Sequence, residues 1–536
     1  MRKSILLVVL FSFTIAVFSQ KKDKVLLTIN NEKIKVSEFK RVYEKNLNVI
    51  DNEEAKKVKN NLELFINYKL KVKEAYDLEL DTLKSYIREI NTYKDQLSAP
   101  YLVDKELIDK MVEDAYFRTK NEIKAQHILV KTPKKASPKD TLTAYNKVLK
   151  ARNKIVSGTP FETVAKEVSE DPSAKVNGGN LGYFSAFRMV YSFENAAYTT
   201  KVGEISMPFK TRFGYHIVKV DALRSSKGEI EAAHILVADT TQVGKTKIDK
   251  AYNKLQNNET FEVVAKQYSD DPRSKNEGGK LGKFGSGRMV KPFDDAAFGL
   301  TKINSYSQPV KTRFGWHIIK LLKKISVQPF EEIKEELTDK VKKSGGAKLS
   351  KESVLNKLKK KYTIVENEAA KAIFKRKDIR EIPKDSLQET IFSINDKKIK
   401  QEEFVTYIKR RNQPIELLFQ MFKDYEILKY YKINLVDTEP DYAYSLKEYE
   451  DGLLLFELMQ RKIWDKSAKD TLGLQNYFAN HIDNYKTKEL KSVKGIVMND
   501  YQFFLEQKWI ADLRRKNTVQ VDKKQLKKLI KFYKKK

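Results

Sequence analysis

Cysteine is absent from this 536-residue chain, which excludes disulfide bonds, thiolate metal sites and a lipid anchor attached to a cysteine. Glycine is also absent before Gly158, and fifteen of the 20 glycines lie between Gly158 and Gly315. Glycine is unfavourable inside helices and common in turns. The two glycine-poor flanks are therefore predicted to be helical, and the middle of the chain is predicted to contain strands and tight turns.

Apolar runs long enough to cross a membrane are lacking as well. The longest, Ile5–Phe18, has 14 residues, whereas a membrane-spanning helix needs about 20. Two positive charges precede this run and a plausible cleavage site follows Ser19, which is typical of a secretory signal. The sequence predicts a signal peptide over 1–19 and a soluble, exported mature protein.

The net charge of +32 favours acidic partners, for example an anionic envelope surface. Interleaved Lys and Glu would equally form solvated helix faces. No nucleic-acid-binding motif accompanies the charge, so nucleic acid is not an expected partner. Gly244-Lys245-Thr246 resembles the end of a phosphate-binding loop, but Asp239 stands where its first glycine is required. We therefore expect no use of ATP.

Four of the five histidines occupy matching places in a segment that occurs twice. The spacing between the copies is 107 residues from His127 to His234 and 101 residues from His216 to His317. Each copy predicts a compact α+β domain of about 100 residues. The first copy contains AQHILV (125–130), SEDPSAKVNGGNLGYF (169–184), FRMVYSFENAA (187–197) and KTRFGYHIVK (210–219). The second contains AAHILV (232–237), SDDPRSKNEGGKLGKF (269–284), GRMVKPFDDAA (287–297) and KTRFGWHIIK (311–320).

Two histidines of each copy lie in strand-like segments. In the first copy, a strand at HILV, helices near 141–157 and 161–169, a Gly-Gly loop, a short helix at FENAAY and a strand at GYHIVKV are predicted. His127 and His216 are then expected side by side on neighbouring central strands, pointing to one face.

The two flanks contain a second internal similarity. Residues 25–46 predict a hairpin, turning at Asn30-Asn31, that leads into a helix, and residues 391–411 align with them at an offset of 365. Apolar stripes in 25–80 and 391–464 are expected to pack against each other, or with a helix near 330–343, and to leave an apolar groove for client proteins. The predicted divisions are 1–19, 20–120 (N-terminal helical segment), 121–224 and 228–323 (repeated domains), 324–390 (helical linker) and 391–536 (C-terminal helical module).

Each copy resembles a parvulin (PpiC-type) peptidyl-prolyl cis-trans isomerase domain. The resemblance rests on an ordered set of motifs: H-I-L-V, S-x-D-P, G-G-x-L-G, R-M-V with Phe four residues after Met, and F-G-[YW]-H-I. It implies no cofactor and no metal. The catalytic residues that it implies are His127, Asp171, Thr211, His216, His234, Asp271, Thr312 and His317. The substrate-binding residues that it implies are Leu181, Met189, Phe193, Phe213, Leu281, Met289, Phe293 and Phe314.

The chain as a whole resembles SurA-type periplasmic chaperones, in which two such domains lie between helical segments. Its C-terminal extension is larger than in that arrangement. The resemblance implies an isomerase and ATP-independent folding chaperone in the periplasm. Its partners would be unfolded or partly folded exported proteins, notably outer-membrane proteins. Client identity and oligomeric state are left open by the sequence.

These residue types suit rotation about an X–Pro bond, which needs no covalent intermediate. Leu, Met and Phe would seat the pyrrolidine ring, and paired histidines bonded to each other and to Thr would form a polar floor. The same residues also have structural interpretations: buried core histidines, Asp-Pro turns and ordinary Met–Phe packing.

Two other functions fit the same sequence. One is a holdase whose repeated domains bind clients without significant isomerase activity, and the other is a basic scaffold on envelope surfaces. The copies also differ, since the second keeps GRMVKPF where the first reads FRMVYSF. Both retain the proposed pocket, and the second is favoured as the more active copy.

Overall fold

The computed structural model describes residues 23–47, 53–133 and 136–534, so the predicted signal peptide lies outside the described residues. The chain divides into two compact units, one containing residues up to Ala99 together with Tyr431–Lys536, the other Pro100–Tyr430. This division follows spatial contacts and differs from the boundaries expected from the sequence, which remain predictions. Within the described ranges, no helix combines the length and the apolar character that crossing a membrane requires.

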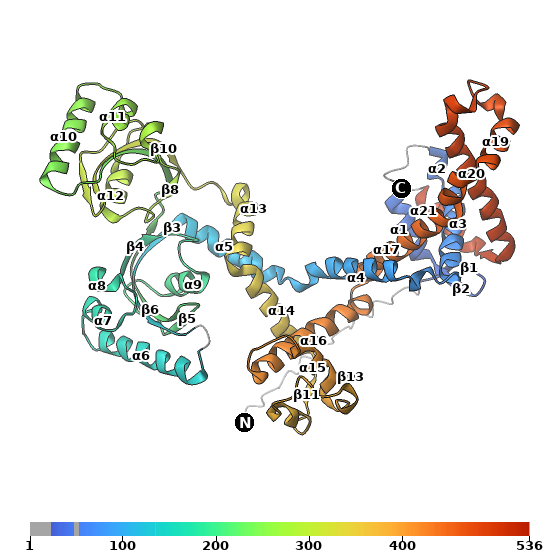
Figure 1. The fold of residues 1–536 in the computed structure, drawn as a ribbon, viewed down its shortest axis with the longest axis horizontal. Coiled ribbons are helices and arrows are strands. Elements are labelled where there is room, and N and C mark those ends of the chain that lie inside the picture. Colours follow the sequence, from blue (N-terminus) through green and yellow to red (C-terminus); the bar gives the residue numbers. More distant parts are fainter. Residues whose placement is uncertain (1–22, 48–52, 134–135, 535–536) are drawn as a thin grey trace, which may run out of the picture. The chain divides into compact units, whose positions relative to one another are not determined.

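The first repeat is built on a four-stranded antiparallel sheet with the order β4-β3-β6-β5. Both faces of this sheet carry buried apolar side chains, since β3 and β6 are buried along most of their length. Helices α6 and α7 cover one face through Val148 and Val164, and α9 covers the other through Phe193 (Figure 1). Its strands are β3 (Asn121–Lys131), β4 (Asn180–Phe184), β5 (Phe209–Thr211) and β6 (Gly214–Ser225). Its helices are α6 (Pro138–Val156), α7 (Phe161–Val168), α8 (Ala174–Asn177) and α9 (Tyr191–Thr199).

The second repeat has the same architecture, with the strand order β8-β7-β10-β9. A 3-10 turn over Lys275–Glu277 replaces α8. The predicted α+β class with two tandem domains is thereby confirmed. The strands are β7 (Glu229–Val237), β8 (Phe284–Gly285), β9 (Val310–Thr312) and β10 (Gly315–Ile325), and the helices are α10 (Gln242–Gln256), α11 (Phe261–Tyr268) and α12 (Lys291–Gly299).

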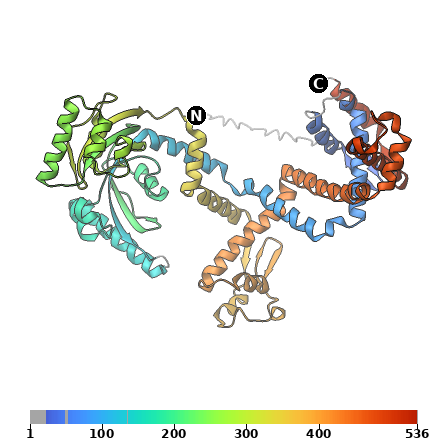
Figure 2. The same ribbon diagram turned by 45° about the horizontal axis from the view of Figure 1, so that its top comes forward.

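Two helices flank the pair of repeats in the sequence and pack against each other. Helix α5 (Lys105–Lys120) leads into β3, and α13 (Phe330–Val341) follows β10. Their shared core contains Met111, Val112 and Leu337, and they lie side by side in both views (Figures 1 and 2). A π-helical turn at Lys342–Gly346, in which Gly345 has φ 116°, separates α13 from α14 (Ala347–Lys361).

A small three-stranded sheet, ordered β11-β12-β13, completes this unit. Its elements are β11 (Ile364–Glu366), 3-10 turns at Ala370–Lys375 and Lys384–Ser386, β12 (Thr390–Ile394), β13 (Lys397–Lys400) and α15 (Gln401–Ile408). Helix α16 (Ile415–Thr438) follows and continues past the end of the unit at Tyr430.

The other unit is formed by both ends of the described chain. Its sheet has the order β14-β1-β2, so a strand near the end pairs with the first hairpin. Leu62, Leu513 and Leu529 share its largest core cluster. Its N-terminal elements are β1 (Val25–Ile29), β2 (Glu32–Lys35), α1 (Val36–Leu47), α2 (Glu53–Lys56), α3 (Val58–Asp77), a 3-10 turn at Leu80–Thr82, α4 (Lys84–Ser98) and a 3-10 turn at Ala99–Leu102. The last of these turns runs past the unit's limit at Ala99. Its C-terminal elements are α17 (Pro440–Met459), a π-helical turn at Gln460–Trp464, α18 (Asp465–Lys469), α19 (Thr471–Asn480), a 3-10 turn at Ile482–Asn484, α20 (Leu490–Lys516), β14 (Val519–Val521) and α21 (Lys523–Tyr533).

The two hairpins that the sequence relates do have matching structures. Strands β1 and β12 show the same order of buried and half-buried residues. Asn30 (φ 53°) and Asn395 (φ 51°) both adopt the left-handed backbone conformation in the turn. They do not belong to one body, because β12 pairs with β11 and β1 with β14. Of the segment 391–464, only the part from Tyr431 onward joins the N-terminal unit, where Leu454 and Leu458 pack with Ala75.

Candidate active site

The histidines of repeat one project from neighbouring strands onto the face covered by α9. In the register of β3 and β6, His127 lies opposite Val218 and His216 opposite Leu129, which makes the two histidines diagonal neighbours on one face. Their rings stack with centroids 5.7 Å apart. Phe193 presents its ring to both of them edge-on, at 5.5 Å in each case. The predicted side-by-side placement is therefore confirmed.

Polar groups continue outward from each end of this pair. Nε2 of His127 lies 2.8 Å from Oδ2 of Asp171, and Nε2 of His216 lies 2.8 Å from the hydroxyl of Thr211. The other carboxylate oxygen of Asp171 accepts hydrogen bonds from the backbone N–H and the hydroxyl of Ser173, both at 2.9 Å. Asp171 is thus a turn residue and a histidine partner at the same time.

Repeat two forms the same arrangement with one added hydrogen bond. His234 lies 2.9 Å from Asp271, His317 lies 2.9 Å from Thr312, and the two Nδ1 atoms are 3.4 Å apart. The Thr312 hydroxyl oxygen accepts the N–H of Phe314. Its own proton can reach Nε2 of His317 at 2.9 Å or the carbonyl oxygen of Gly315 at 3.3 Å, and the shorter distance favours His317. A chain of donors then runs from Thr312 through His317 and His234 to Asp271, with both imidazoles neutral.

The hydrogen-bonded histidine pair was expected in both repeats, but repeat one differs. Within the described ranges, the buried Nδ1 atoms of His127 and His216 have no hydrogen-bond partner. Phe209 stacks on His216 with centroids 5.5 Å apart, whereas Val310 takes the equivalent place opposite His317. Repeat one therefore has a more apolar histidine pair, and repeat two has the continuous polar chain.

The apolar residues of the predicted site divide into two groups. In repeat one, Leu181 and Met189 are half-buried and pack on the core that contains Phe193, and Leu281 and Met289 do the same in repeat two beside Phe293. Phe213 and Phe314 are 48% and 53% exposed. Their backbone N–H groups, not their rings, bind the site threonines, so these two phenylalanines stand apart from the histidine core.

Three kinds of supporting residue were missed in the sequence. Ser169 and Ser269 accept the N–H groups of Leu129 and Leu236 and so hold the S-x-D-P turns against the central strands. Phe209 lines the histidine pair of repeat one. Glu194 and Asp294 are buried carboxylates beneath the loops that carry the site methionines. The sequence signal for Glu194 and Asp294 is that both copies have an acidic residue directly after the site phenylalanine, in FENAA and FDDAA.

The Gly-Gly pairs are structural, as expected. Gly179 and Gly279 have φ 83° and 76°, and a Cβ at these positions would lie 2.3 and 2.2 Å from the carbonyl oxygens of His127 and His234. The backbone N–H groups of His127 and His234 donate hydrogen bonds to the carbonyl oxygens of Gly179 and Gly279, which hold each loop against its strand. Glycine is needed here because the loop must touch the strand that carries His127 or His234.

Comparison with known proteins agrees with this geometry. The family model described as the PPIC-type PPIASE domain of rotamases matches residues 127–222 and 234–323.

Each repeat belongs to the PpiC-type rotamase family.

Similarity to individual proteins is concentrated in the rotamase domains. The chaperone SurA of Methylococcus capsulatus is 31% identical over 211 residues, which are 38% of this chain and 46% of that protein. The foldase protein PrsA of Geobacillus sp. strain WCH70 is 46% identical over 142 residues, 26% of this chain and 48% of that protein. NmPin, the parvulin of Nitrosopumilus maritimus, is 40% identical, covers 19% of this chain and 97% of its own, and has a TM-score of 0.16. The chain spans about half the length of the curated relatives it matches.

His127, His216 and His317 have depressed pKa values. Burial, aided by the adjacent imidazole, lowers the pKa of His216 to about 3 and that of His317 to about 4. Burial also lowers the pKa of His127, although Asp171 opposes this effect. Burial by itself would raise the pKa of Asp171, but hydrogen bonds from Ser173 and His127 bring it below its usual value. The neutral imidazole and the ionised carboxylate are thus the stable forms at neutral pH.

We expect these buried histidines to destabilise the rotamase domains in acid. An unfolded histidine takes up a proton near pH 6.5, whereas His216 and His317 stay neutral in the fold down to about pH 3 and 4. The free energy of unfolding should therefore fall as pH drops below about 6.5, by about 1.4 kcal/mol per pH unit for each histidine. His317→Asn should make this slope shallower in repeat two.

The measurement is hydrogen exchange of β6 and β10 in the full-length protein, corrected for intrinsic rates, between pH 7 and pH 5. His481→Asn serves as the control, since His481 lies outside both repeats. An identical pH slope in the wild type and His317→Asn would contradict the prediction.

Proposed function

We propose that this protein is an exported peptidyl-prolyl cis-trans isomerase and ATP-independent folding chaperone for secreted or outer-membrane proteins. The observation that carries the proposal is the Thr–His–His–Asp arrangement against an apolar wall of Leu, Met and Phe, which occurs in both rotamase domains. Such a site offers a seat for a proline ring beside hydroxyl, imidazole and carboxylate groups that are held in place by their hydrogen bonds.

The reaction requires only non-covalent stabilisation of the twisted amide. Rotation about a peptide bond has a barrier of about 18–20 kcal/mol, because conjugation is lost at the top. Phe193 and Phe293 would hold the pyrrolidine ring against Met189 and Met289. The negative carboxylate of Asp171 or Asp271, fixed by its histidine, would face the rotating carbonyl and disfavour its planar form, which lowers the barrier.

The folding role and the location are supported separately. The signal-like N-terminus supports export, and we place the mature protein in the periplasm. Two similar proteins bear the names chaperone and foldase, which supports a role with unfolded or partly folded exported chains.

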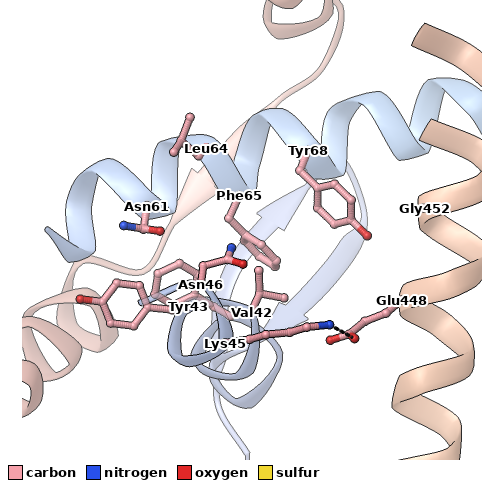
Figure 3. A pocket seen from close by; sticks show the side chains of 11 residues that line it. Val42, Tyr43, Lys45, Asn46, Asn61, Leu64, Phe65, Tyr68, Glu448 and Gly452 are labelled. Atoms are coloured by element: carbon pink, nitrogen blue, oxygen red, sulfur yellow. Dashed lines mark hydrogen bonds and ion pairs between the residues drawn. The ribbon is translucent and has the colours of Figure 1, made fainter. Parts of the chain in front are cut away.

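A groove in the unit formed by the two chain ends offers a place to hold such chains. It encloses about 490 Å³ and is lined by α1, α3 and α17. Figure 3 shows Phe65 and Tyr68 of α3 facing Val42 and Tyr43 of α1 across it. An ion pair of 2.9 Å between Lys45 and Glu448 lies at its edge. A second hollow, of about 350 Å³, shares four of its lining residues and continues it over charged side chains: Val42, Phe65, Tyr68 and Glu448.

The groove suits an extended segment of unfolded polypeptide that carries aromatic side chains. Aromatic rings would pack on Leu64, Val42 and Tyr68, the apolar lining residues that are not buried, and the peptide backbone could bond to Asn46 and Lys45 at the exposed rim. This groove also favours the second candidate function, a holdase whose rotamase domains bind clients without significant isomerisation.

Isomerase kinetics separate the two functions. We expect the full-length protein to accelerate cis-trans exchange of a short X–Pro peptide, with the metal chelator EDTA present and without nucleotide. Exchange is measured by NMR at increasing protein concentration, and uncatalysed exchange takes tens of seconds or longer. A folded protein that leaves the rate equal to that in buffer would reject the isomerase and retain the holdase.

A further inference from the structure

The loops that precede the site methionines, 185–188 and 285–288, contact different neighbours in the two repeats. In repeat two, Gly287 has φ 79°, and a Cβ there would lie 2.1 Å from the carbonyl oxygen of Tyr183 in repeat one. The neighbouring Ser286 accepts a hydrogen bond from Arg224 at 3.1 Å. The loop of repeat two therefore rests on repeat one, and the close approach explains why it carries glycine.

In repeat one the equivalent residue is Phe187, which adopts φ 63°. A non-glycine residue in this left-handed region costs about 1–2 kcal/mol. Its side chain packs, together with Tyr191, on the apolar cluster of α5 and α13 that contains Met111 and Val341. This packing offsets the backbone strain and accounts for FRMVY in place of GRMVK.

Arg118 at the end of α5 strengthens the same contact. It is 4% exposed, its guanidinium lies 5.4 Å from the ring centroids of both Tyr191 and Tyr198, and it donates to Asn195 at 3.0 Å. Its carbonyl oxygen accepts the N–H of Ala186. Helix α5 is thus attached to repeat one on both sides of Met189.

A buried carboxylate holds the loop from the inside. Glu194 is 4% exposed and accepts the backbone N–H of Met189 at 2.8 Å. In repeat two the shorter Asp294 accepts from Gly287 at 3.0 Å and from Ser286 at 3.2 Å instead. Met189 therefore lies between the rotamase core on one side and Met111 and Val341 on the other, around a small cavity.

We propose that Phe187 and Glu194 are positioning residues for the substrate seat of repeat one, and that α5 and α13 supply the surface against which they fix Met189. The proposal rests on the isomerase function proposed above. The helices do not close the seat, because Met189 and Met289 are half-buried alike. In repeat two, Asp294 holds the loop before Met289 from the inside, and Gly287 lets that loop pack on repeat one.

The test uses the full-length chain with repeat two silenced by Asp271→Ala. Phe187→Gly should leave repeat one folded, since glycine stands at this position in repeat two, but should release the loop from α5 and α13. We expect KM for an X–Pro peptide to rise about five-fold, the loss of one ordered contact, with a smaller change in kcat. The NMR signal of the Met189 methyl group should shift, and Phe187→Leu, which keeps an apolar contact but has no ring current, should restore KM in large part. Val156→Ala, at an exposed apolar residue of α6, is the matched control.

An unchanged Met189 methyl signal with an unchanged KM would overturn the proposal. A lower KM would also overturn it, because the helices would then shield the seat. If no protein in the series catalyses isomerisation, the isomerase function fails, while the methyl signal still decides whether Phe187 positions Met189.

A second variant keeps the test independent of Phe187. Glu194→Leu should raise the hydrogen-exchange rate of the Met189 amide by about ten-fold, whereas Glu194→Gln, which keeps an oxygen acceptor, should not. Equal exchange in both variants would remove Glu194 from the proposal.

Discussion

The double variant Asp171→Ala/Asp271→Ala is expected to lower kcat/KM for X–Pro isomerisation by about 100-fold or more, the usual loss when a preorganised electrostatic group is removed. Each aspartate is the partner of a histidine Nε2, at 2.8 and 2.9 Å. Removing it takes away the group that bonds to the imidazole, together with the charge that the proposed mechanism places beside the substrate carbonyl.

The single variants should not be equal. Asp271→Ala should lower turnover of the full-length protein more than Asp171→Ala, because only repeat two joins its histidines in a hydrogen bond. The measurement is peptide isomerisation by NMR at matched protein concentrations. Asp295→Ala, which removes an exposed i,i+4 pair with Lys291, is the control and should leave the rate unchanged. Equal losses from the two single variants would show that the continuous polar chain does not favour repeat two.

The second large effect concerns the groove of α1, α3 and α17. Leu64→Glu combined with Val42→Glu should reduce the ability of the protein to suppress aggregation of an unfolded outer-membrane protein by at least about ten-fold. Both residues line the groove, and neither is buried, so the fold should persist. A client that binds there would have to bury unpaired carboxylates, which is costly.

Isomerase activity on a short peptide should stay unchanged in this variant. Ile87→Glu is the matched control, since Ile87 is 47% exposed on α4 of the same unit and does not line the groove. Light scattering during dilution of the denatured client gives the readout. A folded groove variant with full holding activity would place client binding in the rotamase domains.

Local sequence signals predicted the rotamase domains well. Strands β3 and β6, helix α7 and the Asn30 turn follow from short patterns, and the doubled motifs predicted that His127 and His216 lie side by side and that the histidine pair bonds to Thr211. The bond between His127 and Asp171 was not predicted. The motif set could not predict that His127 and His216 lack the hydrogen bond joining His234 to His317. The two pairs are otherwise alike, since their ring centroids are 5.7 Å apart in repeat one and 5.5 Å apart in repeat two.

Contacts between distant segments were the harder part. Strand β14 has three residues, VQV, too few for a periodic pattern, and its pairing with β1 has no local signal. The departure of FRMVY from GRMVK was visible in the sequence, but its reason lies in helices α5 and α13, one before and one after the repeats. Glu194 was missed because an acidic residue in a short helix is ordinarily solvated.

The pairing of β1 with β14 has a consequence for biosynthesis. Leu27 pairs with Val521, so the sheet that contains the N-terminal hairpin is complete only when almost all of the described chain has been made. At roughly 5–20 residues per second, translation of the intervening segment takes on the order of half a minute to a minute and a half. Each rotamase sheet, by contrast, closes within about 100 residues. The rotamase domains can therefore be complete while the unit formed by the two chain ends is still unfinished, and the groove that we propose for clients forms after them.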